Sequence, residues 1–113
     1  MTMAASVKIT VLRQVLNDFA VEYKDPPGKL GPCQWNQAGR EFLVQAPNVN
    51  IPLEFCSWAW ADIQKYVMAL ARGANFIGSP PGVFVTCCTD GYRPVIFKLE
   101  RIKNPKNIKA TKQ

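Results

Sequence analysis

The chain contains no histidine among its 113 residues. This absence excludes Ser-His and Cys-His catalytic pairs and every metal site that needs an imidazole ligand. No two cysteines are spaced as Cys-x-x-Cys, so neither a zinc knuckle nor a thioredoxin-like motif is present. There is no glycine-rich phosphate loop, and Glu54, Asp62 and Asp90 stand in no motif that pairs a general acid with a base.

Long apolar runs are also missing. None approaches the roughly 18 residues that cross a membrane, and residues 1–6 lack the basic and apolar regions of a signal peptide. We therefore expect a cytoplasmic protein with no membrane partner, in which the thiols stay reduced. The composition, 48% hydrophobic and 19% charged, is typical of a folded globular chain, and the length is that of one domain.

The positive charge is concentrated at one end of the chain. Residues 98–113 hold six basic side chains and one acidic one, so they carry +5 of the formal net charge of +6. We expect one folded domain over residues 7–102 and a flexible basic tail over 103–113. A basic tail can attract phosphate-bearing partners, but no aromatic residue lies among these lysines as a base-stacking surface would require. Nucleic-acid binding is therefore not expected.

Hydrophobic periodicity predicts four strands and one helix. Alternating β-branched residues mark strands, and a stripe formed by Ala59, Ile63, Tyr66, Val67 and Leu70 marks the buried side of a helix. Ser57 is the predicted N-cap, and Gly73 the predicted C′ residue. The elements are strands at 7–15, 40–45, 83–88 and 93–101, with a helix at 57–72. The order β-β-α-β-β predicts an α+β fold, a two-layer sandwich of antiparallel hairpins packed on one helix.

The pair Asp90-Gly91 is the strongest turn signal in the chain. A two-residue type I′ turn there would place Cys88 opposite Arg93 on neighbouring strands. A guanidinium beside the thiol would favour the thiolate, the form that is nucleophilic and binds metals. The alternative is that Cys88 is a small buried hydrophobic residue and that Arg93 turns to solvent or pairs with Asp90. Cys87 should face the opposite side of the strand from Cys88, and we expect Cys87 to be the core residue of the two.

Two further features lie at the predicted start of the helix. Cys56 would lie near the positive end of the helix dipole, which favours a thiolate, or it would pack as a hydrophobic staple. Trp58 and Trp60 are two residues apart and cannot share one face. One ring would enter the core and the other would line a groove or a subunit contact, unless both are core residues. Asp62 is within reach of the Trp58 N–H one turn later.

Three strings resemble one family of small uncharacterised proteins found mainly in bacteria and archaea. They are Gly31-Pro32-Cys33, Phe55-Cys56-Ser57-Trp58-Ala59-Trp60-Ala61-Asp62-Ile63 and Cys87-Cys88-Thr89-Asp90-Gly91-Tyr92-Arg93-Pro94-Val95. The resemblance covers about residues 7–102. It implies no activity, but it implies that the four cysteines belong to a shared pattern, together with Trp58, Trp60, Asp62, Asp90 and Arg93.

The first functional hypothesis is a site built on cysteine. The loop at residues 24–39 carries Cys33, the helix start carries Cys56, and the hairpin carries Cys88. If these segments converge, one thiol would react with a small molecule, with Cys56 or Cys88 as the candidate. Alternatively, Cys33, Cys56 and Cys88 would hold a soft metal such as zinc or copper(I).

Two alternatives belong to other classes of protein. The second hypothesis is a metal-free enzyme for a small molecule, with a pocket lined by Trp58, Trp60 and Tyr66. Arg93 would bind an anionic group there, and Asp62 or a cysteine would move protons. The third hypothesis is a binding module that forms a homodimer through its aromatic residues. The cysteine site ranks narrowly first.

Overall fold

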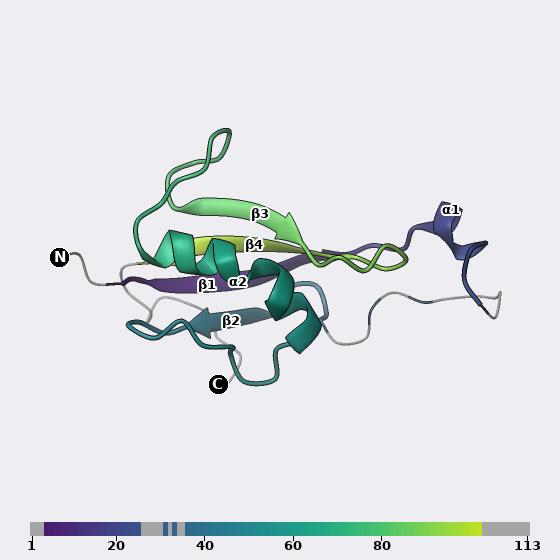
Figure 1. Cartoon of the computed structure of the whole chain (residues 1–113), viewed down its shortest axis with the longest axis horizontal. Helices are drawn as coiled ribbons and strands as arrows, with labels where there is room; N and C mark the ends of the chain where they lie inside the picture. The colour runs from purple at the N-terminus through teal and green to yellow at the C-terminus, as the bar shows by residue number, and fades with distance from the viewer. Residues whose placement is uncertain (1–3, 26–30, 32, 34–35, 103–113) are drawn as a thin grey trace.

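The sheet of this protein is covered on one side by a single long helix, α2 (Figure 1). The computed structural model describes residues 4–25, 31, 33 and 36–102. The elements are β1 (Ser6–Gln14), α1 (Asp18–Val21), β2 (Glu41–Val44), α2 (Ser57–Ala71), β3 (Val83–Cys87) and β4 (Val95–Ile102). The predicted two-layer α+β architecture is confirmed. The predicted flexible tail over 103–113 lies outside the described residues.

All four strands are antiparallel, in the order β2-β1-β4-β3, so the first and last strands are the inner pair. Strand residues alternate between the two faces of a sheet. The face toward α2 is therefore built from alternate residues, and these form most of the core. They are Val7, Ile9, Val11, Phe42, Val44, Val95, Phe97 and Leu99. Because only one face of the sheet is covered, buried residues alternate regularly with more exposed residues in β1 and β4.

Helix α2 places the predicted residues Ala59, Ile63, Val67 and Leu70 in the core. Tyr66 is only partly buried, because it lies at the edge of the stripe. The N-cap prediction is wrong by one residue. Cys56 has extended backbone geometry and its carbonyl accepts the Trp60 N–H at 2.9 Å, so Cys56 is the N-cap and Ser57 is the first helical residue.

The β3–β4 connection differs from the predicted two-residue turn. Phe84 pairs with Leu99 and Thr86 with Phe97, a register shifted by two residues along β4. Asp90 and Gly91 do not adopt the positive φ of a type I′ turn. The Asp90 Oδ1 atom instead accepts the backbone N–H groups of Tyr92 and Arg93, at 3.0 and 3.2 Å. This side-chain turn lengthens the loop, and a shift of two residues keeps every side chain on its original face.

The chain after β1 runs along this loop. The Val15 N–H donates to the Pro94 carbonyl at 2.9 Å, and the Asn17 N–H donates to the Tyr92 carbonyl at 2.8 Å. The Asn17 side chain adds a bond to the Gly91 carbonyl at 2.8 Å. Beyond it lies α1, a four-residue helix that the sequence pattern does not predict, at the end of the molecule (Figure 1). These bonds hold the 89–94 loop in place beside α2.

Candidate functional site

A pocket of about 160 Å³ opens at the N-terminal end of α2, between the helix, the β3–β4 loop and Cys33. It has room for about five waters or a small organic molecule. Its lining falls into three chemical groups. These are the thiols of Cys33, Cys56 and Cys88, the polar side chains of Asn36, Asp90 and Arg93, and the apolar Trp58, Ala59 and Val95.

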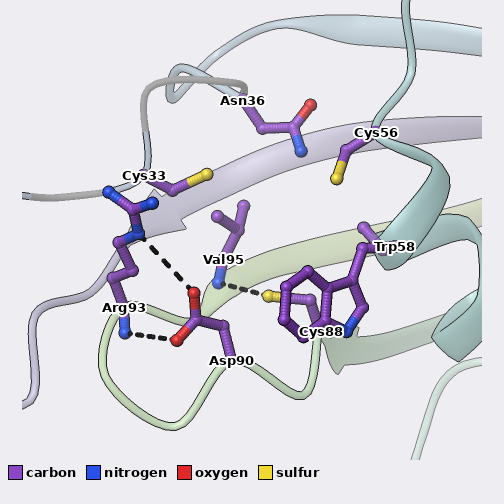
Figure 2. A pocket seen from close by; sticks show the side chains of 9 residues that line it. Cys33, Asn36, Cys56, Trp58, Cys88, Asp90, Arg93 and Val95 are labelled. Atoms are coloured by element: carbon purple, nitrogen blue, oxygen red, sulfur yellow. Dashed lines mark hydrogen bonds and ion pairs between the residues drawn. The ribbon is translucent and has the colours of Figure 1, made fainter. Parts of the chain in front are cut away.

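The three lining cysteines come from three separate segments of the chain (Figure 2). Cys56 is the N-cap of α2, and Cys88 directly follows β3. Cys33 is positioned through its carbonyl, which accepts a hydrogen bond from the Gln14 side chain at the end of β1. All three are free thiols and are partly buried. The structure therefore brings together the three cysteines that the sequence singled out.

Cys87 lies outside this pocket. It pairs with Ile96 on the side of the sheet that faces away from α2, and it is exposed. The prediction that it is a core residue is wrong, because α2 covers only one face of the sheet and β3 is an edge strand. Cys87 and Cys88 thus have different environments even though they are adjacent, and Cys87 serves as an internal reference for an exposed thiol.

Cys88 faces Val95 and not Arg93, which corrects the predicted pairing. Its N–H donates to the Val95 carbonyl at 3.1 Å, and its sulfur accepts the Val95 N–H at 3.3 Å. The Cys88 sulfur therefore links the two segments of the hairpin next to the loop through this hydrogen bond. Arg93 lies in the loop, where its Nε is 3.6 Å from Asp90 Oδ2. The alternative in which Arg93 pairs with Asp90 is the one observed, although Cys88 and Arg93 still line the same pocket.

Cys56 has the most distinctive position of the four thiols. The first N–H groups of a helix have no partner within the helix and give this end a partial positive charge. Cys56 makes no capping hydrogen bond through its side chain, and the first turn of α2 contains no acidic residue. The Cys56 sulfur therefore lies at a helix N-terminus whose charge no capping side chain balances.

Asn36 is a lining residue that the sequence reasoning missed. Asn36 is 1% exposed and lines the pocket, with its amide nitrogen toward the three thiols and its oxygen directed away from them (Figure 2). Within the described part of the chain, its Oδ1 atom has no hydrogen-bond partner. Buried amide oxygens are nearly always paired, so this one is unusual. Asn36 stands in an irregular segment without hydrophobic periodicity, and no sequence signal there predicts its burial.

Three predicted site residues lie elsewhere. The Asp62 carboxylate accepts the Thr89 N–H at 2.8 Å and the Thr89 hydroxyl at 3.0 Å, so it fastens the β3–β4 loop to α2. Trp60 is partly buried and contacts Phe55 edge-on, at 6.2 Å between ring centroids. Tyr66 packs against Phe76 and Phe84.

Of the predicted aromatic pocket, only Trp58 lines the cavity. The side chain of Trp58 is 67% exposed, whereas Trp60 packs against the core. The expected division of roles between these two rings is therefore observed. The reason is their spacing of two residues, which turns them to different sides of α2.

The donor set does not form a metal site in this structure. Among residues 4–25, 31, 33 and 36–102, no group of three or more Cys, Asp and Glu side chains is arranged to hold a metal ion. Cys33, Cys56 and Cys88 share the walls of one pocket without forming a common coordination sphere. Metal binding would require these side chains to move toward each other.

The wider comparisons add no family to this picture. No helix in the described part of the chain is long and apolar enough to cross a membrane. The family resemblance and the homodimer stay predictions. Comparison of the chain with protein-family models, with curated proteins and with solved structures gives no match in any of the three.

Proposed function

We propose that this protein binds a small organic molecule in the thiol-lined pocket and that Cys56 reacts with it as a nucleophile. The observation that carries this proposal is the position of Cys56. It is a partly buried thiol at the uncapped N-terminus of a 15-residue helix, and it lines a cavity of about 160 Å³. A helix N-terminus places a partial positive charge and backbone N–H groups near the sulfur, where they stabilise negative charge that develops during a reaction.

The chemistry follows from what surrounds this sulfur. Because the chain has no histidine, no imidazole base is available, and the thiol proton passes to water. The Cys56 sulfur then forms an S–C bond to an electrophilic carbon of the ligand. The electron pair of the bond that breaks at this carbon leaves with the displaced group. Cys33 and Cys88 lie in the same lining, and the Cys88 sulfur is already held by the Val95 N–H.

The competing roles are less well supported by the contacts. Asp62 was a candidate for proton transfer, but its carboxylate is occupied by Thr89 and does not line the pocket. Soft-metal binding needs a ligand cluster, which the described residues do not form. Arg93 remains a ligand-binding candidate because it does line the pocket.

Competitive alkylation tests the proposal. The folded protein is treated with limiting N-ethylmaleimide, and mass spectrometry follows the labelling of each cysteine over time. We expect Cys56 to react about tenfold faster than Cys87, because a helix N-terminus stabilises a charged group by about 1–2 kcal/mol in partly buried positions. Exposure alone would favour Cys87, which is the more exposed thiol.

Two variants and one denatured sample complete the experiment. The Cys87→Ser variant should retain the fast reaction, and the Cys56→Ala variant should lose it. In urea all four thiols should react at similar rates, since the helix field is then absent. Labelling of Cys56 at or below the rate of Cys87 in the folded protein would contradict the proposal, as would a fast phase that persists in Cys56→Ala.

A further inference from the structure

We infer that this protein forms a homodimer in which β3 pairs, antiparallel, with β3 of a second copy. The inference concerns a surface outside the pocket, so it does not rest on the proposed function. Figure 1 shows β3 as an outer strand of the sheet, and of the described segments only the loop that leads from α2 extends past it. An outer strand presents unpaired N–H and C=O groups, to which another strand can be added. Unlike the predicted aromatic interface, this one is built from backbone groups.

The pairing of β3 with β4 shows which backbone groups of β3 face outward. Just before β3, the Gly82 carbonyl accepts the Arg101 N–H at 2.8 Å. Just after it, the Cys88 N–H donates to the Val95 carbonyl at 3.1 Å. In an antiparallel pair, residues that bond to the neighbouring strand alternate with residues whose N–H and C=O groups point away from it. Even-numbered residues of β3 therefore bond to β4, and odd-numbered residues present their backbone groups at the outer edge.

Two hydrogen bonds limit this edge to the middle of β3. At the start of the strand, the Val83 N–H donates to a carbonyl of the preceding turn at 3.1 Å. Beyond the end of the strand, the Thr89 N–H donates to the Asp62 carboxylate at 2.8 Å. Between these two points, the N–H and C=O groups of Val85 and Cys87 have no partner among the described residues, and both residues are exposed. The open part of the edge is thus a short run of four backbone groups.

A two-fold axis beside Thr86 pairs these four groups with the same four groups of a second copy. Val85 of each chain then lies opposite Cys87 of the other chain, and both pairs exchange two N–H···O=C bonds. The two Thr86 side chains lie opposite each other at the axis, on the side of the sheet that α2 covers, because Thr86 pairs with the core residue Phe97. Cross-strand threonine pairs are favourable. All four open groups are satisfied in each copy.

The charges near this edge favour a second copy over a charged partner. β3 has the sequence Val-Phe-Val-Thr-Cys, so an acidic or basic strand would find no opposite charge on it. On β4, Lys98 lies beside the paired segment, opposite Val85. The Lys98 residues of the two copies would be three strand spacings apart, about 14 Å, which exceeds the Debye length of about 8 Å. The other outer strand, β2, begins with Glu41, and charged residues on an edge discourage such pairing.

Sedimentation equilibrium of the full chain tests the dimer, from about 10 µM to about 1 mM protein, the range in which small interfaces associate. We expect the average mass to rise from that of a monomer toward that of a dimer and no further, because a two-fold interface is used up by two copies. Hydrogen exchange gives a second measurement. The Val85 and Cys87 amides should exchange more slowly as the concentration rises, whereas the amides of α2 should not change.

Variants at one position separate the backbone from the side chain. Val85→Pro removes an N–H that has no partner in the described chain, so the fold should tolerate it, as outer strands tolerate proline. In the dimer it removes two of the four bonds between the chains, and we expect the dissociation constant to rise at least about tenfold. Val85→Thr keeps the N–H and should leave association unchanged. If Val85→Pro fails to fold, Val85→Lys weakens the dimer by placing like charges at the edge.

A cross-link tests the position of the axis. Thr86→Cys, made together with Cys87→Ser, would bring the two new thiols to Cα atoms about 4.5 Å apart, within reach of a disulfide. Oxidation by diamide should link the chains there, as peptide mapping shows, and Leu12→Cys in the same background is the exposed control. No more linking than in that control, a monomer at every concentration, or association that Val85→Pro and Val85→Lys leave unchanged would overturn the β3 dimer. None of these variants changes a residue of the pocket, so the alkylation experiment is decided separately.

Discussion

The two ends of α2 are built in opposite ways. At the C-terminal end, Gly73 takes the left-handed conformation with φ of 98°, and the Arg101 side chain from β4 completes the end. Its Nη1 donates to the carbonyls of Leu70 and Ala74 at 3.0 and 2.8 Å, and its Nη2 donates to Asn75 Oδ1 at 2.8 Å. A cation is thus placed where the helix dipole is negative.

The N-terminal end lacks all of this. No side chain caps it, no acid balances it, and the neighbouring Asn36 carries an unpaired buried oxygen in the described structure. Both ends leave the same number of backbone groups without helical partners, so the requirement for hydrogen bonds is the same. The Arg101 side chain meets part of this requirement at the C-terminal end, whereas the Cys56 side chain makes no capping hydrogen bond at the N-terminal end. The pocket of the proposed function lies at the end without the side-chain cap.

The largest expected effect is at the closed end. Arg101→Met keeps most of the apolar stem but removes three hydrogen bonds, and we expect it to lower the free energy of unfolding by about 2–3 kcal/mol, roughly 1 kcal/mol per bond. Urea unfolding followed by tryptophan fluorescence measures this change. Arg93→Met is the matched control at the open end and should cost less than about 1 kcal/mol, as partly exposed ion pairs do. If both variants lose the same amount of unfolding free energy, the proposed difference between the two ends of α2 is wrong.

A smaller effect is expected where the loop of the open end is fastened to α2. Asp62→Ala removes the bonds to the Thr89 N–H and hydroxyl, and we expect a loss of about 1–2 kcal/mol in the free energy of unfolding. Hydrogen exchange at the Thr89 amide should become faster. Glu22→Ala removes an exposed acid at the end of α1 and should change neither value.

The outcome for Asp62 also separates two roles. A positioning residue alters stability and loop exchange together. Unchanged stability combined with slower labelling of Cys56 would instead indicate that Asp62 acts on the thiol, a role different from the proton transfer predicted for it in the metal-free enzyme.

Much of the fold was predictable because its strands and its long helix leave regular patterns of hydrophobic residues in the sequence. The alternation of Val7, Ile9 and Val11 and the stripe from Ala59 to Leu70 both reflect one covered face, and a single sequence records such a pattern directly. The hairpin register was not predictable from Asp90-Gly91. The Asp90 side chain forms the turn itself, and this interaction competes with the backbone turn that the same residues usually form.

The candidate site was predictable in part for a different reason. The predicted helix start placed Cys56 and Trp58 together, and the predicted hairpin placed Cys88 near Arg93, although the residue that faces Cys88 is Val95. The position of Asn36 in the pocket and the exposure of Cys87 depend on how distant parts of the chain pack, including which face of the sheet is covered. Such properties depend on tertiary packing and leave no periodic pattern in the local sequence.

The smallest expected effect comes from closing the open end. In Cys56→Asp, the new carboxylate should accept backbone N–H groups of the first turn of α2, which the Cys56 side chain does not cap. Relative to Cys56→Ala, we expect the free energy of unfolding to rise by about 1 kcal/mol, the usual value of an acidic N-cap. Urea unfolding of the two variants measures this gain. An unchanged free energy of unfolding would mean that a capping side chain adds nothing at this end of α2, and that the two ends do not differ in the way described.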